Sequence, residues 1–217
     1  MDEAFDIMDL GYVDYLEAWD VQRQIHAEVA SGERVPTLLL CDHPPTITFG
    51  KKGGRKNLIA STESLSQRGF AMYDIERGGD VTYHGPGQLV GYPIFKVGWQ
   101  VQQFLRQIED ALIEVLANYS VNAVGSPGYA GVWVNDEKVA AIGVAIKRRV
   151  SFHGFALNVQ PDLSHFDTII PCGIRDKGVT SMAELLGQDI TLTEVKPKVV
   201  RAFQDVFVER QEEAVSD

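Results

Sequence analysis

Residues 138–159 run Lys138-Val-Ala-Ala-Ile-Gly-Val-Ala-Ile-Lys147-Arg-Arg-Val150-Ser-Phe-His-Gly-Phe-Ala-Leu-Asn-Val159. Two apolar runs, 138–147 and 150–159, flank a short cationic turn, and this arrangement predicts a β-hairpin. Two further strand candidates, 121–124 and 130–134, precede the hairpin directly. Consecutive strands of this kind argue against a strict alternation of strand and helix.

The rest of the chain adds single helices between further strands. Apolar residues at helical spacing predict helices over 12–30 and 99–119, and another over 193–208 with Pro197 in its first turn. Shorter helices are predicted over 62–68 and 180–184, and strands over 37–41, 46–49, 71–76, 81–84 and 89–95. The mixture predicts an α+β fold (α/β in the broad sense), with helices packed on a mixed, largely antiparallel sheet.

The composition bounds the class of protein. The chain has 217 residues without a composition break, which predicts one domain over 1–217 with a fraying acidic tail at 209–217. Its net charge of −10 argues against nucleic acid as a partner. No apolar stretch is long enough for a membrane span, and the acidic N-terminus lacks the layout of a secretory signal. Two cysteines make no disulfide framework, so we expect a cytoplasmic protein.

The least core-like stretch is Arg77-Gly-Gly-Asp-Val-Thr-Tyr-His-Gly-Pro-Gly-Gln-Leu-Val-Gly-Tyr92, hereafter the glycine-rich stretch. Its glycines permit positive φ angles and let backbone N–H groups approach a ligand closely. No Gly-Lys-Ser/Thr follows, and the stretch does not open a helix after a strand, so it is not a phosphate-binding loop of those kinds. Two interpretations remain: a loop with demanding turns, or part of a ligand site.

Cys172 lies in a second unusual segment, Thr168-Ile-Ile-Pro-Cys-Gly-Ile174. Pro171 and Gly173 shape the backbone around the thiol, which suits a presented nucleophile, although a structural thiol is the alternative. A nucleophilic cysteine needs a cation or base to favour its thiolate. The five histidines are candidates for that helper. Lys138 is another, because small apolar residues follow it, although most lysines are solvated surface residues.

Two short features concern metals and charge. Cys41-Asp-His43 is the only close Cys/His pair, and no second pair follows at ligand spacing, so no metal site is predicted. Cations cluster at Lys51-Lys-Gly-Gly-Arg-Lys56 and at Lys147-Arg-Arg149. Each cluster is either a solvated turn or a local basic patch for an acidic partner or a phosphate group.

Taken together, these segments resemble the lipoyl(octanoyl) transferases of lipoate biosynthesis. The resemblance rests on the glycine-rich stretch, on Lys138-x-x-Ala-x-Gly143, on His153-Gly-Phe-Ala-Leu-Asn158 and on Pro171-Cys-Gly-Ile174. It extends from Asp42-His-Pro-Pro-x-x-Thr-x-Gly50 to Thr180-Ser-Met182, which is nearly the whole chain. The motifs occur in the right order and spacing, without a departure at the motif positions.

The resemblance implies the fold of the biotin and lipoate protein ligases, and an ATP-independent acyltransferase without a cofactor. It implies that the octanoyl group of octanoyl-acyl carrier protein moves to Cys172 as a thioester. The group then moves to a lysine ε-amino group on lipoyl domains, those of the 2-oxoacid dehydrogenase complexes and the glycine-cleavage H protein. Lys138 matches the lysine that lowers the cysteine pKa. The positions that match the acyl substrate site are Arg77, Gly78, Gly79, Asp80, Val81, Thr82, Tyr83, His84, Ala141, Ile142, Gly143, Gly154, Phe155 and Ala156.

Several points stay open at the level of sequence. An ATP-dependent lipoate or biotin protein ligase is the alternative enzyme, although Arg77-Gly-Gly-Asp does not match the Gly-Arg-Gly-Arg loop of biotin ligases. A non-catalytic acyl-carrier-binding relative is the alternative from another class. The role of His84 is unsettled, and Val81, Tyr83, Ile142, Phe155 and Leu157 can line an apolar acyl slot only if their strand faces allow it. With both partners acidic in the resembling family, the two cationic clusters become candidates for docking the carrier protein.

Overall fold

An eight-stranded sheet forms the centre of the computed structural model, which describes residues 5–126, 128–173 and 177–209. The sheet is mixed and mostly antiparallel, and one short strand, β11 (Gly178–Val179), pairs with β9 outside the main path. The main path runs in the order β1 (Asp6–Tyr12), β2 (Thr37–Asp42), β6 (Gln88–Ile94), β10 (Val150–Asn158), β9 (Glu137–Lys147), β8 (Tyr129–Val134) and β7 (Val124–Ser126). The predicted fold class is confirmed.

The hairpin of β9 and β10 is the longest antiparallel pair and confirms the hairpin prediction. Only Arg148 and Arg149 lie between the two strands, and both have positive φ angles, 51° and 62°. Two consecutive residues with positive φ are the requirement of the tight turn whose twist matches that of the flanking strands. The middle of the hairpin brings Gly143 opposite Gly154.

Strand β1 was not predicted from the sequence. The β-α-β unit that it forms with α1 and β2 at this edge of the sheet was therefore not predicted either. It runs parallel to β2, and α1 (Tyr15–Ser31) connects the two strands, because parallel neighbours need a crossover. As an edge strand with half-exposed side chains, β1 needs no continuous apolar run. Asp14 caps the first turn of α1 by accepting a hydrogen bond from the backbone N–H of Leu16.

A second, three-stranded sheet stands beside the large one and was not predicted as separate. It consists of β4 (Ala71–Asp74), β3 (Thr46–Phe49) and β5 (Val81–His84), in that order. It has its own apolar cluster, which includes Leu65 of α2 (Thr62–Gln67) and Phe166 of η2 (Leu163–Thr168). The glycine-rich stretch enters β5 from this side and then continues into β6 of the large sheet, so it bridges the two sheets.

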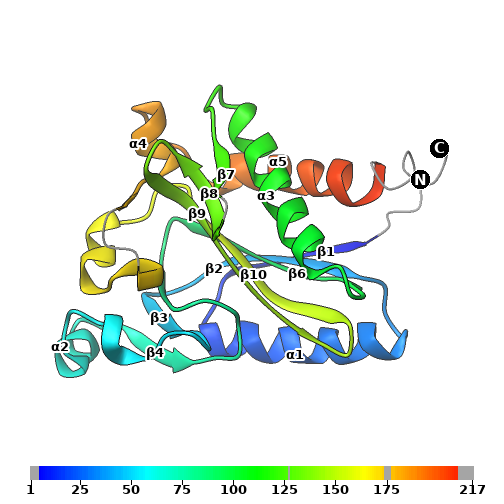
Figure 1. The fold of residues 1–217 in the computed structure, drawn as a ribbon, viewed down its shortest axis with the longest axis horizontal. Coiled ribbons are helices and arrows are strands. Elements are labelled where there is room, and N and C mark those ends of the chain that lie inside the picture. Colours follow the sequence, from blue (N-terminus) through cyan, green and yellow to red (C-terminus); the bar gives the residue numbers. More distant parts are fainter. Residues whose placement is uncertain (1–4, 127, 174–176, 210–217) are drawn as a thin grey trace.

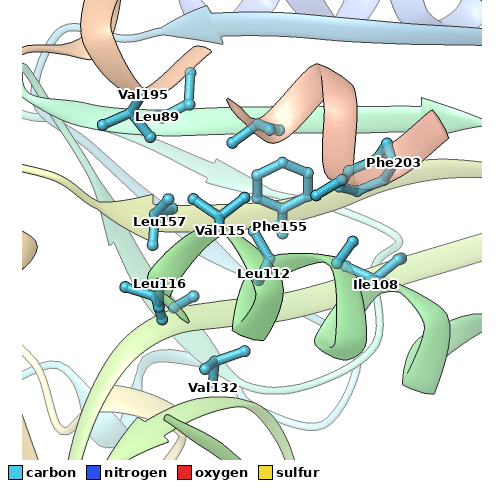
Figure 2. Close-up of a cluster of buried hydrophobic side chains, with 14 of the residues drawn as sticks. Leu89, Ile108, Leu112, Val115, Leu116, Val132, Phe155, Leu157, Val195 and Phe203 are labelled. Atoms are coloured by element: carbon cyan, nitrogen blue, oxygen red, sulfur yellow. The ribbon is translucent and has the colours of Figure 1, made fainter. Parts of the chain in front are cut away.

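Helices cover both faces of the large sheet (Figure 1). On one face, α3 (Val101–Ala117) and α5 (Leu192–Gln204) pack against the strands, and Leu112, Phe155 and Phe203 lie in the resulting core (Figure 2). On the other face, α1 packs against β6 and β10. Because side chains alternate along a strand, Leu40 of β2 points to the first core and Cys41 to the second.

Most predicted elements are confirmed, with shifts of a few residues at their ends. The strand predicted over 121–124 is wrong, because β7 begins only at Val124. Pro197 is the sixth residue of α5 and not in its first turn, because a capping box between Thr191 and Glu194 starts the helix at Leu192. Short helices not predicted from the sequence are η1 (Arg55–Asn57), η2 and η3 (Pro171–Gly173), whereas α4 (Met182–Leu186) was predicted. The π-helical turn η4 (Asp205–Glu209) continues α5 within the helix predicted over 193–208.

In the described part of the chain, none of the helices combines the length and the apolar composition that a membrane crossing requires. The tail at 210–217, which forms most of the segment predicted to fray, lies outside the described residues.

Candidate active site

A cavity of about 50 Å³ lies where the large sheet, the glycine-rich stretch and α1 meet. Most of the positions assigned to the acyl site by resemblance line it, although they come from three separate segments of the chain. They are Arg77, Gly79, Thr82 and His84 from the glycine-rich stretch, Ala141, Ile142 and Gly143 from β9, and Gly154, Phe155 and Ala156 from β10. The tertiary structure therefore brings these segments together around one small cavity.

Two glycines of the hairpin allow the close backbone packing around this cavity. A Cβ atom on Gly154 would lie 2.1 Å from the carbonyl oxygen of Gly91. Any residue other than glycine would therefore force the backbone to move at this position. A Cβ atom on Gly143 would lie 3.1 Å from the carbonyl oxygen of Gly78. The N–H of Gly78 in turn donates to the carbonyl of Val144 at 2.8 Å, which fixes the glycine-rich stretch to β9.

Arg77 is buried and holds the glycine-rich stretch against the small sheet. Its Nη2 donates to the carbonyl oxygen of Thr48 at 2.8 Å and to the Thr48 hydroxyl at 3.1 Å. Its Nη1 donates to the carbonyl of Gly78 at 3.0 Å. A buried guanidinium needs such acceptors to offset its desolvation. The same side chain lines the cavity, so its charge also bears on whatever enters there.

His84 continues this hydrogen-bonded chain as a neutral imidazole. Its Nδ1 lies 2.9 Å from Oε1 of Gln88, which only accepts, so Nδ1 carries the proton. Its Nε2 faces the Thr48 hydroxyl at 3.5 Å. Burial lowers the pKa of His84 to about 3. A neutral, hydrogen-bonded His84 suits a positioning role and not that of a cationic helper near neutral pH.

The same chain of hydrogen bonds continues to the strand that carries Lys138. The amide of Gln88 donates to Oδ1 of Asn158 at 2.9 Å, and the amide of Asn158 donates to the carbonyl of Thr180 at 2.9 Å. The N–H of Thr180 then donates to the carbonyl of Lys138 at 3.1 Å. The cavity wall and the Lys138 backbone are thus held by one buried polar network, which favours a fixed relative geometry.

Four of the resemblance-assigned positions lie off the cavity lining. Val81 and Tyr83 point from β5 into the core of the small sheet, where the Tyr83 hydroxyl pairs with Nδ1 of His165 at 2.7 Å. Gly78 touches β9 through its backbone. Asp80 accepts hydrogen bonds from the amide of Asn57 and from its neighbour's N–H. Among the slot candidates, Ile142 and Phe155 line the cavity, and Leu157 lies in the main core.

Lys138 is a buried lysine on β9, only 5% exposed. Its Nζ lies 4.7 Å from the ring centroid of Trp133, a distance that permits a cation–π contact. Its aliphatic stem runs past Gly131, where a Cβ atom would lie 3.4 Å from Cε. Lys177 approaches the same ring, with its Nζ 5.2 Å from the centroid and 2.6 Å from Oδ1 of Asp136. The ring therefore holds Lys138 in a defined place at low exposure.

Cys172 occupies the middle of the 3₁₀ turn η3, and its side chain lies outside the part of the chain that the structure describes. The turn contacts β5. Gly173 has a φ of 71°, and a Cβ atom there would also lie 3.2 Å from Oδ2 of Asp80. Beyond the turn, Val179 of β11 is the parallel neighbour of Lys138. The backbone around Cys172 is therefore anchored to the glycine-rich stretch on one side and to the Lys138 strand on the other.

Cys41, the other cysteine of the chain, has the properties of a structural thiol. It is fully buried in the core under α1, and its Sγ lies 3.5 Å from Nε2 of His43. Burial raises the pKa of the Cys41 thiol well above its ordinary range. A thiol that stays protonated and has no access to solvent is not a nucleophile.

His153 is a cavity-lining residue that we did not assign to the acyl site from the sequence. Its backbone is left-handed, with a φ of 56°, and its N–H donates to Oε1 of the fully buried Gln22 at 2.9 Å. Its Nε2 lies 3.5 Å from Oε2 of Glu76. Burial lowers the pKa of His153 to about 4, although Glu76 acts in the opposite direction.

We predict that the two buried histidines, His84 and His153, make the protein sensitive to acid. Their pKa values lie below the value of about 6.5 for an unfolded histidine, so the unfolded chain binds protons that the folded chain does not. Stability is then constant above about pH 6.5 and falls below it, by about 2 kcal/mol for each histidine at pH 5. Urea unfolding at pH 7.5 and 5.0 measures this loss, and His153→Gln is expected to remove about half of it. Equal free energies of unfolding at the two pH values would contradict the prediction.

The other cavity-lining residues missed at the level of sequence are Tyr15, Val90 and Tyr92. Tyr92 closes the glycine-rich stretch, and its hydroxyl lies 2.8 Å from Nε2 of His43. Tyr15 stands at the start of α1, and its ring stacks on that of His84 at 5.8 Å between centroids. Nothing in the local sequence marks Tyr15, because its contact is made across 69 residues of chain. In residues 5–126, 128–173 and 177–209, no group of three or more metal-ligating side chains is found.

The arrangement of sheet and helices is that of the lipoate and biotin protein ligases. A lipoate protein ligase described as putative, from T. acidophilum with bound lipoic acid, superposes with a TM-score of 0.74 at 14% identity, covering 93% of this chain and 85% of that one. The biotin protein ligase of Aquifex aeolicus superposes with a TM-score of 0.56 at 16% identity, covering 95% and 70%. These likenesses show the fold.

The sequence places the chain within this fold class more narrowly. Residues 14–204 match the family described as the lipoyl protein ligase A/B catalytic domain, and the chain belongs to this family. An octanoyltransferase of Chloroflexus aurantiacus is 48% identical, over 91% of this chain and 92% of that protein. An octanoyltransferase of Caldicellulosiruptor saccharolyticus is 44% identical, over 91% and 86%. The resemblance found in the sequence is confirmed.

Proposed function

We propose that this chain is an octanoyltransferase of protein lipoylation, with residues 1–217 as one catalytic domain. Octanoyl-acyl carrier protein is the donor, and a lysine on a lipoyl domain of a 2-oxoacid dehydrogenase complex or of the glycine-cleavage H protein is the acceptor. Relatives named as octanoyltransferases at 44–48% identity support this function. The observation that carries it is the cavity, because the acyl-site segments expected from the family converge on it from three parts of the chain.

The cavity suits an acyl chain in its chemistry. Val90, Ile142 and Phe155 supply apolar surface, so burial of methylene groups there is favourable. Its volume of about 50 Å³ holds only a few water molecules, so entry of an eight-carbon chain requires lining side chains to move apart. Two polar groups at its wall, Arg77 and His84, are already hydrogen-bonded within the protein.

In the first step, the Cys172 thiolate attacks the carbonyl carbon of the donor thioester. A bond from the Cys172 sulfur to carbon forms, the bond from carbon to the carrier sulfur breaks, and the carrier leaves as a thiol after taking a proton. Lys138 accepts the Cys172 proton and returns it to the carrier sulfur. One thioester is exchanged for another, so the step needs no ATP and no cofactor.

In the second step, the acceptor lysine attacks the acyl-Cys172 thioester. The amine loses a proton to Lys138, the new carbon–nitrogen bond forms and the bond from carbon to the Cys172 sulfur breaks. Lys138 then passes the proton to Cys172, which leaves as the thiol. Both steps pass through a tetrahedral oxyanion, which backbone N–H donors stabilise. The Pro171–Gly173 turn and the glycine-rich stretch are the segments that offer such donors. Cys41 is fully buried, so its exclusion as a nucleophile supports the assignment of Cys172. Cys41 is also a free thiol, which fits a cytoplasmic enzyme.

The test is the intact mass of the purified protein after mixing with octanoyl-acyl carrier protein in the absence of ATP. We expect a gain of one octanoyl group, removed by hydroxylamine, mapped to the peptide that contains Cys172, and transferred to a lipoyl domain on addition of that acceptor. The variant Cys41→Ala is the matched control and is expected to keep the adduct, since Cys41 lies in the core under α1.

Three other outcomes contradict the proposal in different ways. Transfer to the lipoyl domain without any adduct indicates direct transfer from the carrier. Transfer only after ATP and free octanoate are added indicates a ligase, the activity of structural neighbours such as a lipoate-protein ligase A bound with ATP. Binding of the carrier with no acylation of either protein indicates a non-catalytic relative.

A further inference from the structure

The loop Lys51–Lys56, hereafter the cationic loop, is a strongly charged surface on an acidic chain. Lys51, Lys52, Arg55 and Lys56 are all exposed. Arg55 pairs with Asp74 at 3.1 Å, whereas Lys51, Lys52 and Lys56 take part in none of the ion pairs found among the described residues. The loop therefore presents uncompensated positive charge to solvent, on a chain of net charge −10.

The cationic loop packs along the glycine-rich stretch. The N–H of Lys51 donates to the carbonyl of Arg77 at 3.1 Å, and the N–H of Lys52 donates to the carbonyl of Gly79 at 2.9 Å. Gly53 lies so close to Asp80 that a Cβ atom there would overlap its carboxylate. The loop makes these contacts through its backbone and not through its side chains. The ammonium groups of Lys51 and Lys52 therefore stay available for a partner.

The C-terminal end of the loop touches the turn that carries Cys172. The carbonyl of Asn57 accepts a hydrogen bond from the N–H of Ile170 at 2.8 Å. The Asn57 amide also donates to Asp80, and a Cβ atom on Gly173 would lie 3.1 Å from its Nδ2. The cationic loop thus borders both the acyl-site stretch and the turn of the proposed nucleophile. A thioester presented at Cys172 brings its carrier over this loop.

The second cationic cluster, Lys147–Arg149, lies in a different place. It forms the tip of the β9–β10 hairpin, and Lys147 is nine residues along β9 from Lys138. At roughly 3.3 Å per residue, this separation is about 30 Å. Arg149 also stacks over the ring of Trp99 at 4.7 Å. The hairpin tip is therefore far from Lys138, although its charge is similar to that of the loop.

We infer that the cationic loop is the docking surface for the acidic face of the protein that carries the octanoyl thioester. The inference rests on the proposed function. Long-range repulsion from a chain of net charge −10 disfavours an acidic partner everywhere except at such a local patch, where opposite charges steer encounter. The acceptor is the less suitable partner here, because its reacting group is a lysine ammonium, which the same charges repel.

Ile59 adds an apolar contact to this surface. It lies three residues after Lys56, and its side chain is 63% exposed. Its N–H donates to the carbonyl of Thr168 at 2.8 Å, which places it on the same side as the segment that leads into the Cys172 turn. An exposed apolar side chain beside unpaired cations is the composition of a protein docking surface and not of a site for a lone phosphate.

The test compares two double variants with the same change of charge. One is Lys51→Glu with Lys52→Glu in the cationic loop, and the matched control is Lys147→Glu with Arg148→Glu at the hairpin tip. Acylation rates are measured with octanoyl-acyl carrier protein, with octanoyl-coenzyme A, and with octanoyl-pantetheine, which has neither protein nor phosphate. For the loop variant we expect KM for the carrier to rise by about tenfold or more, with octanoyl-pantetheine kinetics within about twofold of wild type. For the control we expect wild-type values with all three donors.

Ionic strength provides a second readout. KM of the wild type for the carrier is expected to rise with added salt, because salt screens the attraction between the cationic loop and the acidic carrier. KM of the loop variant, which has lost this attraction, is expected not to rise. Equal carrier KM for the loop variant and the wild type overturns the docking surface. An equal loss with octanoyl-coenzyme A shows that the loop binds a phosphate and also overturns it, as does a raised KM for the lipoyl domain alone.

Failure of the proposed function has a separate signature. In that case, the wild type acquires no octanoyl group from any of the three donors, including octanoyl-pantetheine, which does not depend on docking. If the wild type is acylated by octanoyl-pantetheine and the loop variant and hairpin variant behave alike with the carrier, the function stands and the docking surface is wrong.

Discussion

Replacing Cys172 with alanine is expected to lower the rate of octanoyl transfer by about 10³-fold or more, with every donor and acceptor alike. In the proposed mechanism the variant loses the group that forms the covalent intermediate, and removal of a nucleophile leaves the contribution of binding and orientation. The residual rate should therefore stay above that of the uncatalysed mixture, because binding and orientation of the two substrates remain. The measurement is the initial rate of lipoyl-domain octanoylation, at saturating donor and acceptor.

The variant should otherwise resemble the wild type. Cys172 lies in the turn η3, where the N–H of Ile170 donates to the carbonyl of Asn57, and β11, the strand beyond the turn, pairs with β9. Its urea unfolding curve and its KM for octanoyl-acyl carrier protein are therefore expected to change little. A rate within tenfold of wild type would show that the octanoyl group passes directly from donor to acceptor and would remove Cys172 from the mechanism.

The second large effect is expected for Lys138→Met, which should lower kcat by about 10²- to 10⁴-fold, the usual contribution of a general acid–base group. Methionine keeps the apolar stem that packs beside Gly131 and Trp133, so the substitution removes the amine with little change of packing. The variant should also form the acyl-enzyme more slowly, because in the proposed mechanism Lys138 is the group that takes the proton of Cys172. Rapid-quench measurement of adduct formation separates this step from transfer to the acceptor.

Two further variants make the interpretation specific. Lys138→Arg keeps the positive charge but holds its proton permanently, so it rescues the rate only if Lys138 acts as a charge. Lys177→Met is the matched control, because Lys177 lies against the same Trp133 ring and pairs with the exposed carboxylate of Asp136. We expect Lys177→Met to retain activity within a few-fold. A Lys138→Met enzyme as active as this control would contradict the role of Lys138.

Prediction from sequence succeeded where the signal is local. The hairpin of β9 and β10, the long helix α3 and the short helix α4 all follow from patterns that extend over 5 to 22 residues. It failed where the decisive contact is distant. Strand β1 is half exposed and becomes a strand only by pairing with β2, which lies beyond α1. The strand expected at 121–124 failed for the same reason, since β7 is defined by its pairing with β8.

For the candidate site, too, local sequence signals were predictable and distant contacts were not. Cys172, Lys138 and the acyl-site segments were identified as candidates because family motifs are contiguous in sequence. Their strand faces were not predictable, since β5 sends Val81 and Tyr83 to the small core and Thr82 and His84 to the cavity. A shift of one residue in register would exchange these faces, and the register is set by pairing with β3.

The sequence by itself determined the fold class, the family and the residues that can carry the chemistry, because composition, periodicity and motif spacing are properties of the chain alone. Only the tertiary structure decided that Cys41 is enclosed under α1, that Tyr15 and His153 join the cavity wall, and that the cationic loop borders the Cys172 turn while Lys147–Arg149 does not. Burial and proximity depend on which distant segments pair and on which face each side chain takes, and both are settled only when the two sheets and their helices pack together.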